Sequence, residues 1–473
     1  MSKSEKPGHL RWWIIGICFL ATTINYLDRQ CLSVTAPVIS HEFHLSNRDY
    51  SSIVMSFLAA YTIMQALSGR IIDRLGTRLG MSLSVVWWSV AAILHAFSTG
   101  LWSLRACRFL LGMGEAGNWP AATKVVSEWF PARERGLAVA IFDSGSSLGG
   151  MLAPPLVGWI VLRHGWRPAF VLTGAVGILW LLLWLRSYRK PDLHPRLGRA
   201  ELALILAGRG PQAEPGRRAV SWAGLLRQRP VWGIVLGRML TDCVWWFYVY
   251  WLPKYLTDQR GFSLSDVALF AWIPFFTVDV GNLGGGWLAG HLMKRGWTLN
   301  ASRKCVLALG AAGMLAGLPA GMTSSATLCL GLIAAATLSY SAWGTMMLTL
   351  PADLFPAAAV ASVSGMSGTG AGLGGIAFTW ITGLVVDKLS YQPIFAVAGL
   401  MPLVALVLVC LLIPTIREGK IPPSMNAGCL VLLPRFARKL DLPESAVDHP
   451  RLRSTGDNEA TRCRNSSIPS DSF

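Results

Sequence analysis

Long apolar runs separated by short polar loops fill the chain up to residue 416. A helix needs about 20 mainly apolar residues to cross a bilayer, and twelve runs are long enough to do so. Glycine and proline are frequent inside them, as is typical of membrane-spanning helices. We therefore predict an all-α membrane protein with twelve transmembrane helices, at residues 12–35, 50–70, 80–98, 101–124, 137–161, 168–186, 231–252, 266–290, 305–321, 326–350, 360–385 and 393–416.

A polar gap divides the predicted helices six and six. We expect a six-helix N-terminal bundle at 1–186, a cytoplasmic linker at 187–230, a six-helix C-terminal bundle at 231–416, and a tail at 417–473. The tail is polar and irregular, which favours disorder. Within the linker, residues 201–208 read ELALILAG and could form a short interfacial helix.

Composition and charge agree with a membrane protein. The chain is 53% hydrophobic and only 14% charged, whereas soluble proteins carry about 25% charged residues. The formal net charge of +17 comes from Lys and Arg that concentrate in the loops on one side of the predicted helices. Cytoplasmic loops carry such an excess, so we place both termini in the cytoplasm. The expected partner of this basic chain is therefore the lipid bilayer, not a nucleic acid.

Charged side chains interrupt two of the apolar runs. Asp28 and Arg29 lie in the run 12–35, and Arg108 and Glu115 lie in the run 101–124. Such a charge costs at least about 2.5–3.5 kcal/mol near the bilayer centre, so it usually faces a partner or an aqueous route for substrate or ions. The alternative is that an arginine extends to the membrane interface while Glu115 only joins two helices. For Arg105, which lies closest to the helix end, the functional reading and this alternative are equally good. For Arg108 and Glu115 we favour the functional reading.

The depths of these residues follow from helix geometry. A helix rises 1.5 Å per residue, so Asp28 and Arg108 are expected at a similar depth, with Glu115 about 10 Å deeper on nearly the same face as Arg108. Tyr61 and Gln65 are four residues apart and share one face of the helix 50–70. We expect these side chains to line a shared aqueous pocket.

No spacing typical of a catalytic or metal site is present. The nine cysteines form no CxxC pair, and the sequence from His41 to His44 lacks the HExxH spacing. The stretches GSSLGG and GTGAGLGG lack the Lys-Ser/Thr ending of a phosphate loop, and small residues let membrane helices approach closely. We predict no enzyme activity, no metal and no cofactor.

The two halves of the chain repeat each other. The sequence Phe130-Pro-Ala matches Phe355-Pro-Ala, and Gly145 matches Gly370, at a constant offset of 225 residues. Each copy follows an even number of crossings in its half, so the repeat is parallel. Parallel halves are a known transporter plan, in which the substrate site lies between them near the bilayer midplane.

One loop resembles the signature loop of the major facilitator superfamily. It runs from Gly69 to Arg78 and reads GRIIDRLGTR. The resemblance implies a gate formed by Gly69, Asp73, Arg74 and Arg78. In this gate Asp73 can pair with an arginine or a helix N-terminus, and the two arginines can pair with acids. The second-half counterpart has Gly290 where an acid would stand, which leaves no equivalent acid there.

Further motifs are similar to the anion:cation symporter family within that superfamily. They are NYLDR at residues 25–29, RFLLGMGEA at 108–116, Pro120, Lys124 and EWFP at 128–131. The segments EWFPARERGLAVAIFDSGSSLGGMLAPPLV and TDCVWWFYVYWLPKYL most resemble hexuronate and aldonate proton symporters. The resemblance implies a monomeric transporter in the bacterial inner membrane that imports a sugar acid with protons by alternating access. Rival readings are a transporter of another organic anion and a membrane sensor that does not move its ligand.

The resemblance also implies roles for individual residues. Arg29 and Arg108 are the substrate-binding arginines: Arg29 binds the substrate anion, and Arg108 is engaged by acids in the empty site. Tyr61 and Gln65 add polar contacts to the substrate. Asp28 and Glu115 carry protons, because desolvation and nearby arginines act in opposite directions on a buried carboxyl group.

In the second half, Trp245, Tyr248 and Asn282 are expected to contact the sugar. The alternative for the aromatic residues is an interfacial belt, which we favour for Tyr250 and Trp251. Arg238 and Asp242 are four residues apart and can neutralise each other. No role is assigned to Asp143, Asp242 or Asp279, although Asp143 stands where we expect an uncharged polar residue.

Overall fold

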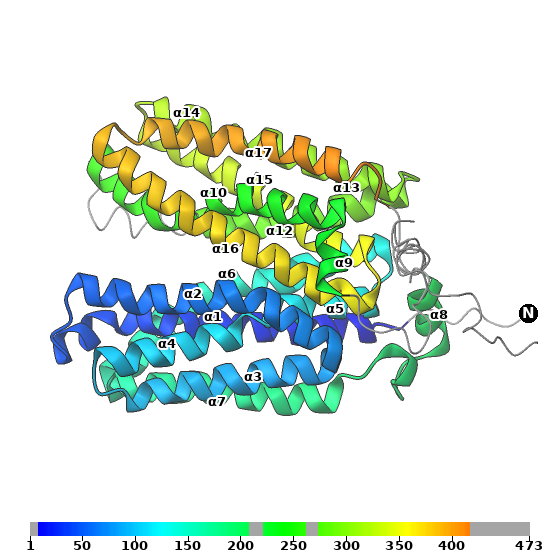
Figure 1. The fold of residues 1–473 in the computed structure, drawn as a ribbon, viewed down its shortest axis with the longest axis horizontal. Helices are drawn as coiled ribbons and strands as arrows, with labels where there is room; N and C mark the ends of the chain where they lie inside the picture. The colour runs from blue at the N-terminus through cyan, green and yellow to red at the C-terminus, as the bar shows by residue number, and fades with distance from the viewer. Residues whose placement is uncertain (1–7, 208–220, 262–272, 417–473) are drawn as a thin grey trace, which may run out of the picture. The chain divides into compact units, whose positions relative to one another are not determined.

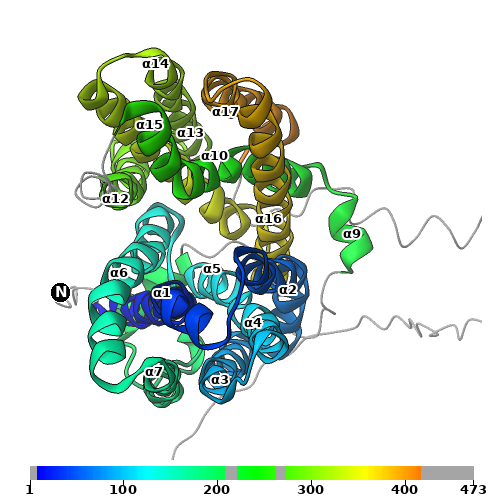
Figure 2. The ribbon, with the colours of Figure 1, turned by 90° about the vertical axis from the view of Figure 1, so that its left-hand side faces the viewer.

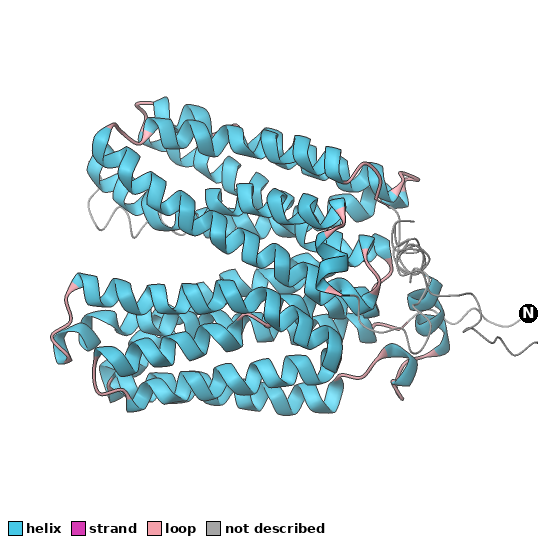
Figure 3. Ribbon diagram, in the orientation of Figure 1, coloured by secondary structure: helices cyan, strands magenta, loops and turns pink. Residues whose placement is uncertain are grey.

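The computed structural model describes residues 8–207, 221–261 and 273–416, and within these ranges the regular structure is helical, without strands (Figure 3). The predicted tail and parts of the linker and of the segment 266–290 lie outside the described residues. The first half contains α1 (Leu10–Glu42), α2 (Asn47–Leu75), α3 (Thr77–Leu94), α4 (Leu101–Glu115), α5 (Asn118–Trp129), α6 (Ala132–His164) and α7 (Trp166–Ser187). The second half contains α10 (Arg229–Arg260), α12 (Ile273–Lys294), α13 (Leu299–Met314), α14 (Gly317–Met322), α15 (Ala326–Leu354), α16 (Ala357–Lys388) and α17 (Gln392–Leu412).

The helices form two groups, one from each half of the chain. Seen nearly end on, α1 to α7 lie together and α10 to α17 lie together (Figure 2). Nine helices among the described residues are long and apolar enough to cross a membrane. The remaining predicted crossings correspond to α4 with α5, to α10 and to α12. The predicted all-α membrane fold is therefore confirmed.

The predicted continuous helix 101–124 is wrong, because the chain breaks between α4 and α5. Pro120 lies in the first turn of α5, where its missing N–H is tolerated, whereas one continuous helix would need that donor. The break also packs closely on α3: a Cβ at Gly114 would lie 2.7 Å from the backbone nitrogen of Trp88, and one at Gly117 would lie 2.1 Å from the Ser84 hydroxyl oxygen. The break thus places Glu115 at the last residue of α4, and α5 continues from there to Trp129.

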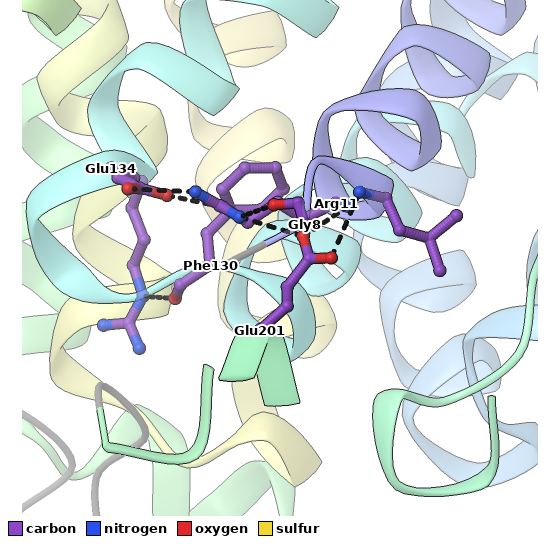
Figure 4. A network of polar contacts seen from close by, with 7 residues as sticks. Gly8, Arg11, Phe130, Glu134 and Glu201 are labelled. Carbon is purple, nitrogen blue, oxygen red and sulfur yellow. Dashed lines mark hydrogen bonds and ion pairs between the residues drawn. The ribbon is translucent and has the colours of Figure 1, made fainter. Parts of the chain in front are cut away.

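The linker contains a short helix, α8 (Arg199–Ala207), where the sequence ELALILAG predicts one. Its Glu201 accepts hydrogen bonds from the backbone nitrogens of Leu10 and Arg11, at 3.2 and 3.1 Å, at the start of α1 (Figure 4). The Arg11 guanidinium bridges Glu201 at 2.9 Å and Glu134 of α6 at 2.8 Å. Because a helix N-terminus favours negative charge, Glu201 fixes α8 to the first half. Figure 1 shows α8 near the N-terminal end of the chain.

Candidate functional site

A cavity of about 480 Å³ lies between the two halves. This volume is within the range of small-molecule sites, about 300–1,000 Å³. Residues from α1, α2, α5 and α6 of the first half, and from α10, α12, α15 and α16 of the second, line it. The predicted substrate residues among the lining side chains are Arg29, Tyr61, Gln65, Trp245 and Asn282.

Arg29 is the cavity-facing cation of the first half. Its guanidinium carbon lies 4.7 Å from the ring centroid of Tyr26, 4.8 Å from that of Tyr61, 5.0 Å from that of Phe57 and 6.0 Å from that of Trp119. Aromatic faces attract a cation at such distances, most strongly away from water. The surrounding rings therefore hold the guanidinium in place at the cavity wall.

Glu115 is the partner of Arg29. The Nε atom of Arg29 donates to the Oε2 atom of Glu115 at 3.0 Å, and the Glu115 side chain is fully buried. Its other carboxyl oxygen has no hydrogen-bond partner among the described residues. The pair joins α1 to α4, so one acid and one base from separate helices meet directly behind the cavity wall.

Arg108 and Asp28 lie deeper in the first half and are not among the residues that line the cavity. Arg108 donates to the backbone carbonyl of Arg29 at 3.1 Å. Glu115 forms its ion pair with Arg29, and its charge also reaches Arg108. That acids engage Arg108 in the empty site stays a prediction. Asp28 is 1% exposed, and no group among the described residues lies within full hydrogen-bond geometry of its carboxyl oxygens. The Thr173 hydroxyl and the charges of Arg108 and Glu115 nevertheless act on it.

The second half contributes Trp245 and Asn282 to the wall. Trp245 stacks on Tyr340, with ring centroids 5.9 Å apart and planes 3° apart. The Asn282 amide nitrogen donates to Asp143 at 3.2 Å, and its amide oxygen accepts from Thr345 at 3.0 Å. The orientation of this amide is fixed by its two partners, with its nitrogen directed across the boundary between the halves.

Tyr248 does not take the predicted place. It is 3% exposed and packs in the core of the second half against Phe247 and Phe395. Successive residues of a helix are about 100° apart, so Tyr248 lies about 60° around α10 from Trp245, on the side turned away from the cavity centre. The prediction that Tyr248 contacts the sugar is therefore wrong, because its side chain is buried in the core and does not line the cavity.

Three charged residues of the wall had no binding role in the sequence analysis. The Nε and Nη2 atoms of Arg238 donate to the Oδ2 atom of Asp242 at 3.0 and 2.6 Å. Asp143 accepts from the indole nitrogen of Trp119 at 2.9 Å, besides the bond from Asn282. All three line the cavity, whereas Asp279 is not among the lining residues. The sequence showed that these three charged residues lie in apolar runs, which is typical of functional residues. It did not show that all three line the same cavity.

The signature loop forms a polar seam between α2 and α16. Asp73 pairs with Lys124 at 2.8 Å and accepts from the backbone nitrogens of Ala361 and Ser362 at 3.3 and 2.7 Å, near the start of α16. A Cβ at Gly69 would lie 2.1 Å from the Ala361 carbonyl oxygen. Asp73 therefore reaches across to the second turn of α16, and glycine at 69 permits the approach; its pairing with a helix N-terminus stays a prediction.

The two arginines of the loop have different surroundings, and the predicted pairing of Arg74 with an acid stays a prediction. Arg78 donates to the backbone carbonyl of Leu185 at 2.5 Å, and Arg74 is exposed. The predicted pairing with acids is therefore wrong for Arg78, because its helix start lies beside the end of α7, where carbonyl groups are free to accept.

A second seam joins α6 to α13 and α15. Asp353 pairs with Arg135 at 3.1 Å and with Arg303 at 2.8 Å, and Arg303 donates to the Ala132 carbonyl at 2.9 Å. Here α12 approaches through glycine, since a Cβ at Gly286 would lie 2.5 Å from the Gly136 carbonyl oxygen. Where the second-half loop lacks an acid, Asp353 supplies it from another helix.

Known proteins are similar to this chain in sequence and in fold. The sequence model of the Major Facilitator Superfamily matches residues 18–302. The chain is 34% identical to the hexuronate transporter of Escherichia coli strain K12, over 88% of this chain and 96% of the relative. It is 37% identical to the galacturonate transporter of Dickeya chrysanthemi, over 70% of this chain and 97% of the relative. Its fold matches the proton:xylose symporter XylE with a TM-score of 0.68 at 18% identity, covering 89% of this chain and 99% of that one.

Proposed function

The chain belongs to the major facilitator superfamily, a family of transporters and not of enzymes, and we propose that it imports a sugar acid together with protons. The substrate class is a hexuronate or an aldonate. The two halves of one chain alternate in opening the cavity to either side of the bacterial inner membrane. Both termini are cytoplasmic, in keeping with the Lys and Arg of the predicted inner loops.

The observation that carries this proposal is the ion pair between Arg29 and Glu115 at the cavity wall. A substrate carboxylate binds an arginine by parallel charge-assisted hydrogen bonds, so it must compete with Glu115 for the same guanidinium. A buried carboxylate that loses its partner is costly, by about 3–5 kcal/mol. Protonation of Glu115 removes that cost, and substrate binding therefore favours proton uptake.

Asp28 is the second proton site of the proposal. Its carboxyl group is buried without a hydrogen-bond partner among the described residues, and Arg108 lies near enough for its charge to act on it. Arg108 also holds the carbonyl of Arg29, so a change in the charge of Asp28 is transmitted to the residue that binds the substrate.

Alternating access is supported by the two seams. Asp73, Lys124, Asp353 and their partners join the halves near the ends of the helices that the Lys and Arg pattern assigns to the cytoplasm. Opening the cavity to the cytoplasm requires that these contacts separate. A monomer suffices for this cycle, because residues of one chain make both walls of the cavity.

The direct test is uptake by proteoliposomes with an alkaline interior. Labelled D-galacturonate or D-galactonate should accumulate, and a protonophore should abolish the accumulation. Glu115→Gln should retain exchange of internal for external substrate but lose proton-driven accumulation, while Asp242→Asn should retain the dependence on the pH gradient. Accumulation by Glu115→Gln equal to that of the unchanged protein would exclude the role given to Glu115.

Two outcomes separate the rival readings. A transporter of another organic anion would exchange that anion but none of the sugar acids. A sensor would bind a sugar acid, seen as thermal stabilisation, without exchanging internal for external substrate.

A further inference from the structure

Asp143 is a charged cavity residue that the proposed proton route does not use. It extends from the middle of α6, lines the cavity and is partly exposed to it. One carboxyl oxygen accepts from the Trp119 indole nitrogen at 2.9 Å and the other from the Asn282 amide nitrogen at 3.2 Å. A carboxylate offers about four acceptor positions, so about two stay open toward the cavity.

Trp119 relates Asp143 to the proposed carboxylate site. The centroid of its ring lies 6.0 Å from the guanidinium carbon of Arg29, and its indole N–H donates to Asp143. A molecule whose carboxylate reaches Arg29 and whose carbon chain follows the Trp119 ring therefore presents its far end to Asp143. For a hexuronate or an aldonate that end carries hydroxyl groups, which can donate to the open positions of the carboxylate.

The charges around the two ends of this path differ. Behind Arg29, the acids Glu115 and Asp28 are matched by the arginines Arg29 and Arg108. Around Asp143 the charged groups are Arg238, Asp242 and Asp279.

This group holds one arginine and three acids, which are Asp143, Asp242 and Asp279. Among the described residues, the only ion pair within the group joins Arg238 to Asp242. The uncharged groups at Asp143 are Trp119 and Asn282, with Tyr340 close by. The far end of the path therefore holds more acidic than basic side chains.

We propose that Asp143 is a specificity residue that selects sugar acids with one carboxylate and rejects those with a carboxylate at both ends. Its hydrogen bonds from Trp119 and Asn282 fix the carboxylate in the wall, where it accepts from substrate hydroxyl groups. A second substrate carboxylate at this position meets a like charge in a site largely removed from water, which is strongly unfavourable. The proposal rests on the proposed function and names the substrate class of the same cavity.

The test compares Asp143→Asn with the unchanged protein in proteoliposomes. Unlabelled galactarate, which carries two carboxylates on a six-carbon chain, competes with labelled D-galacturonate for uptake. In the unchanged protein, galactarate should compete weakly. In Asp143→Asn, the ratio of the half-inhibitory concentrations of galactarate and galacturonate should fall by about tenfold or more, because the like charge is gone and an amide remains.

Two further variants separate charge from shape. Asp143→Glu keeps the charge and should keep the preference for galacturonate over galactarate. Asn282→Ala removes one hydrogen bond to Asp143 but leaves the charge of Asp143, so the same preference should remain. An unchanged ratio in Asp143→Asn would overturn the proposal, as would an equal fall of the ratio in Asn282→Ala.

The outcome also distinguishes this proposal from the proposed function. If the unchanged protein takes up galacturonate and the ratio does not move, only the selectivity of Asp143 fails. If the unchanged protein takes up no sugar acid in this assay, the proposed function fails and the selectivity with it. A loss of proton-driven accumulation in Asp143→Asn at an unchanged ratio would instead make Asp143 a proton carrier, and would overturn the assignment as a specificity residue.

Discussion

The cavity has an arginine held by an acid on each side, and the two pairs are built differently. In the first half, Arg29 of α1 binds Glu115 of α4, 86 residues away in the sequence. In the second half, Arg238 binds Asp242 one turn further along the same helix, α10. A pair between two helices changes whenever those helices tilt or one partner is protonated, whereas a pair within one turn moves as a unit.

This difference assigns separate tasks to the halves. The pair of Arg29 and Glu115 can open to admit a substrate carboxylate, and its four aromatic neighbours keep the guanidinium in position after the acid leaves. The pair of Arg238 and Asp242 is a fixed part of the wall. The first half is therefore expected to couple substrate to protons, and the second half to shape and charge the far end of the cavity.

Replacing each arginine by lysine tests this division most strongly. Lysine keeps the charge but loses the planar fork and much of the stacking on aromatic rings. Arg29→Lys should lower uptake of galacturonate by about 100-fold or more, because two parallel hydrogen bonds to the substrate are lost. Arg238→Lys should lower it by less than about tenfold, since a point charge still neutralises Asp242. Initial uptake rates in proteoliposomes measure both, with thermal unfolding as the check that each variant is folded.

The opposite order, with Arg238→Lys the more damaging change, would place the substrate anion in the second half.

Removing the charge of Asp28 is expected to have the next largest effect. Asp28→Asn should lower proton-driven accumulation by about tenfold while exchange of internal for external substrate continues, because a buried acid that lacks a partner can gain and lose a proton without breaking an ion pair. The matched change in the second half, Asp242→Asn, should leave accumulation dependent on the pH gradient. Accumulation by Asp28→Asn at the level of the unchanged protein would leave Glu115 as the sole coupling acid.

The two seams extend the comparison to the inner ends of the helices. Asp353 holds two arginines, whereas Asp73 holds one lysine and two backbone amides. Asp353→Asn leaves two buried arginines without their acid and should open the inner end more than Asp73→Asn does. A cysteine introduced at Gln65, inside the cavity, reports this opening. Its labelling by a membrane-impermeant thiol reagent in inside-out vesicles should accelerate several-fold in Asp353→Asn, and less in Asp73→Asn.

Vesicles of the opposite orientation are the control, because labelling from the periplasmic side should slow when the inner end opens. Equal acceleration from both sides would indicate a loosened protein and not a shifted gate.

The helices and their grouping could be predicted from the sequence, because apolar runs of about 20 residues have few other structures available to them in a bilayer. The same holds for Arg29, Tyr61 and Gln65, whose polar groups in apolar runs require a cavity. The break between α4 and α5 could not be predicted, since glycine and proline also occur in unbroken membrane helices. The close approaches to α3 at Gly114 and Gly117, together with Pro120 in the first turn of α5, accompany the break, and the two approaches are visible only in the structure.

The pairing of charges was the harder problem. Spacing along α4 puts Arg108 and Glu115 on nearly one face, but which arginine reaches Glu115 depends on how α1 packs against α4. The role of Asp353 was hidden for the same reason, because its partners Arg135 and Arg303 come from two different helices. Tyr248 was assigned to the cavity on its aromatic character alone, and the rotation of α10 turned it into the core.

Two tryptophans give the smallest and most selective test of the comparison. Trp119 of the first half bonds Asp143 through its indole nitrogen, whereas Trp245 of the second half lines the cavity as a ring stacked on Tyr340. Trp119→Phe keeps an aromatic face beside Arg29 but removes one donor to a charged acceptor, a contact worth about 1.5–3 kcal/mol. Because this bond is already present without substrate, only its effect on how firmly Asp143 is held against substrate hydroxyl groups reaches the binding step. The Kd for galacturonate should therefore rise by about fivefold. Trp245→Phe keeps a stacking ring and should change the Kd by less than about twofold. Substrate-dependent thermal stabilisation measures both, and a larger effect at Trp245 would transfer the main sugar contact to the second half.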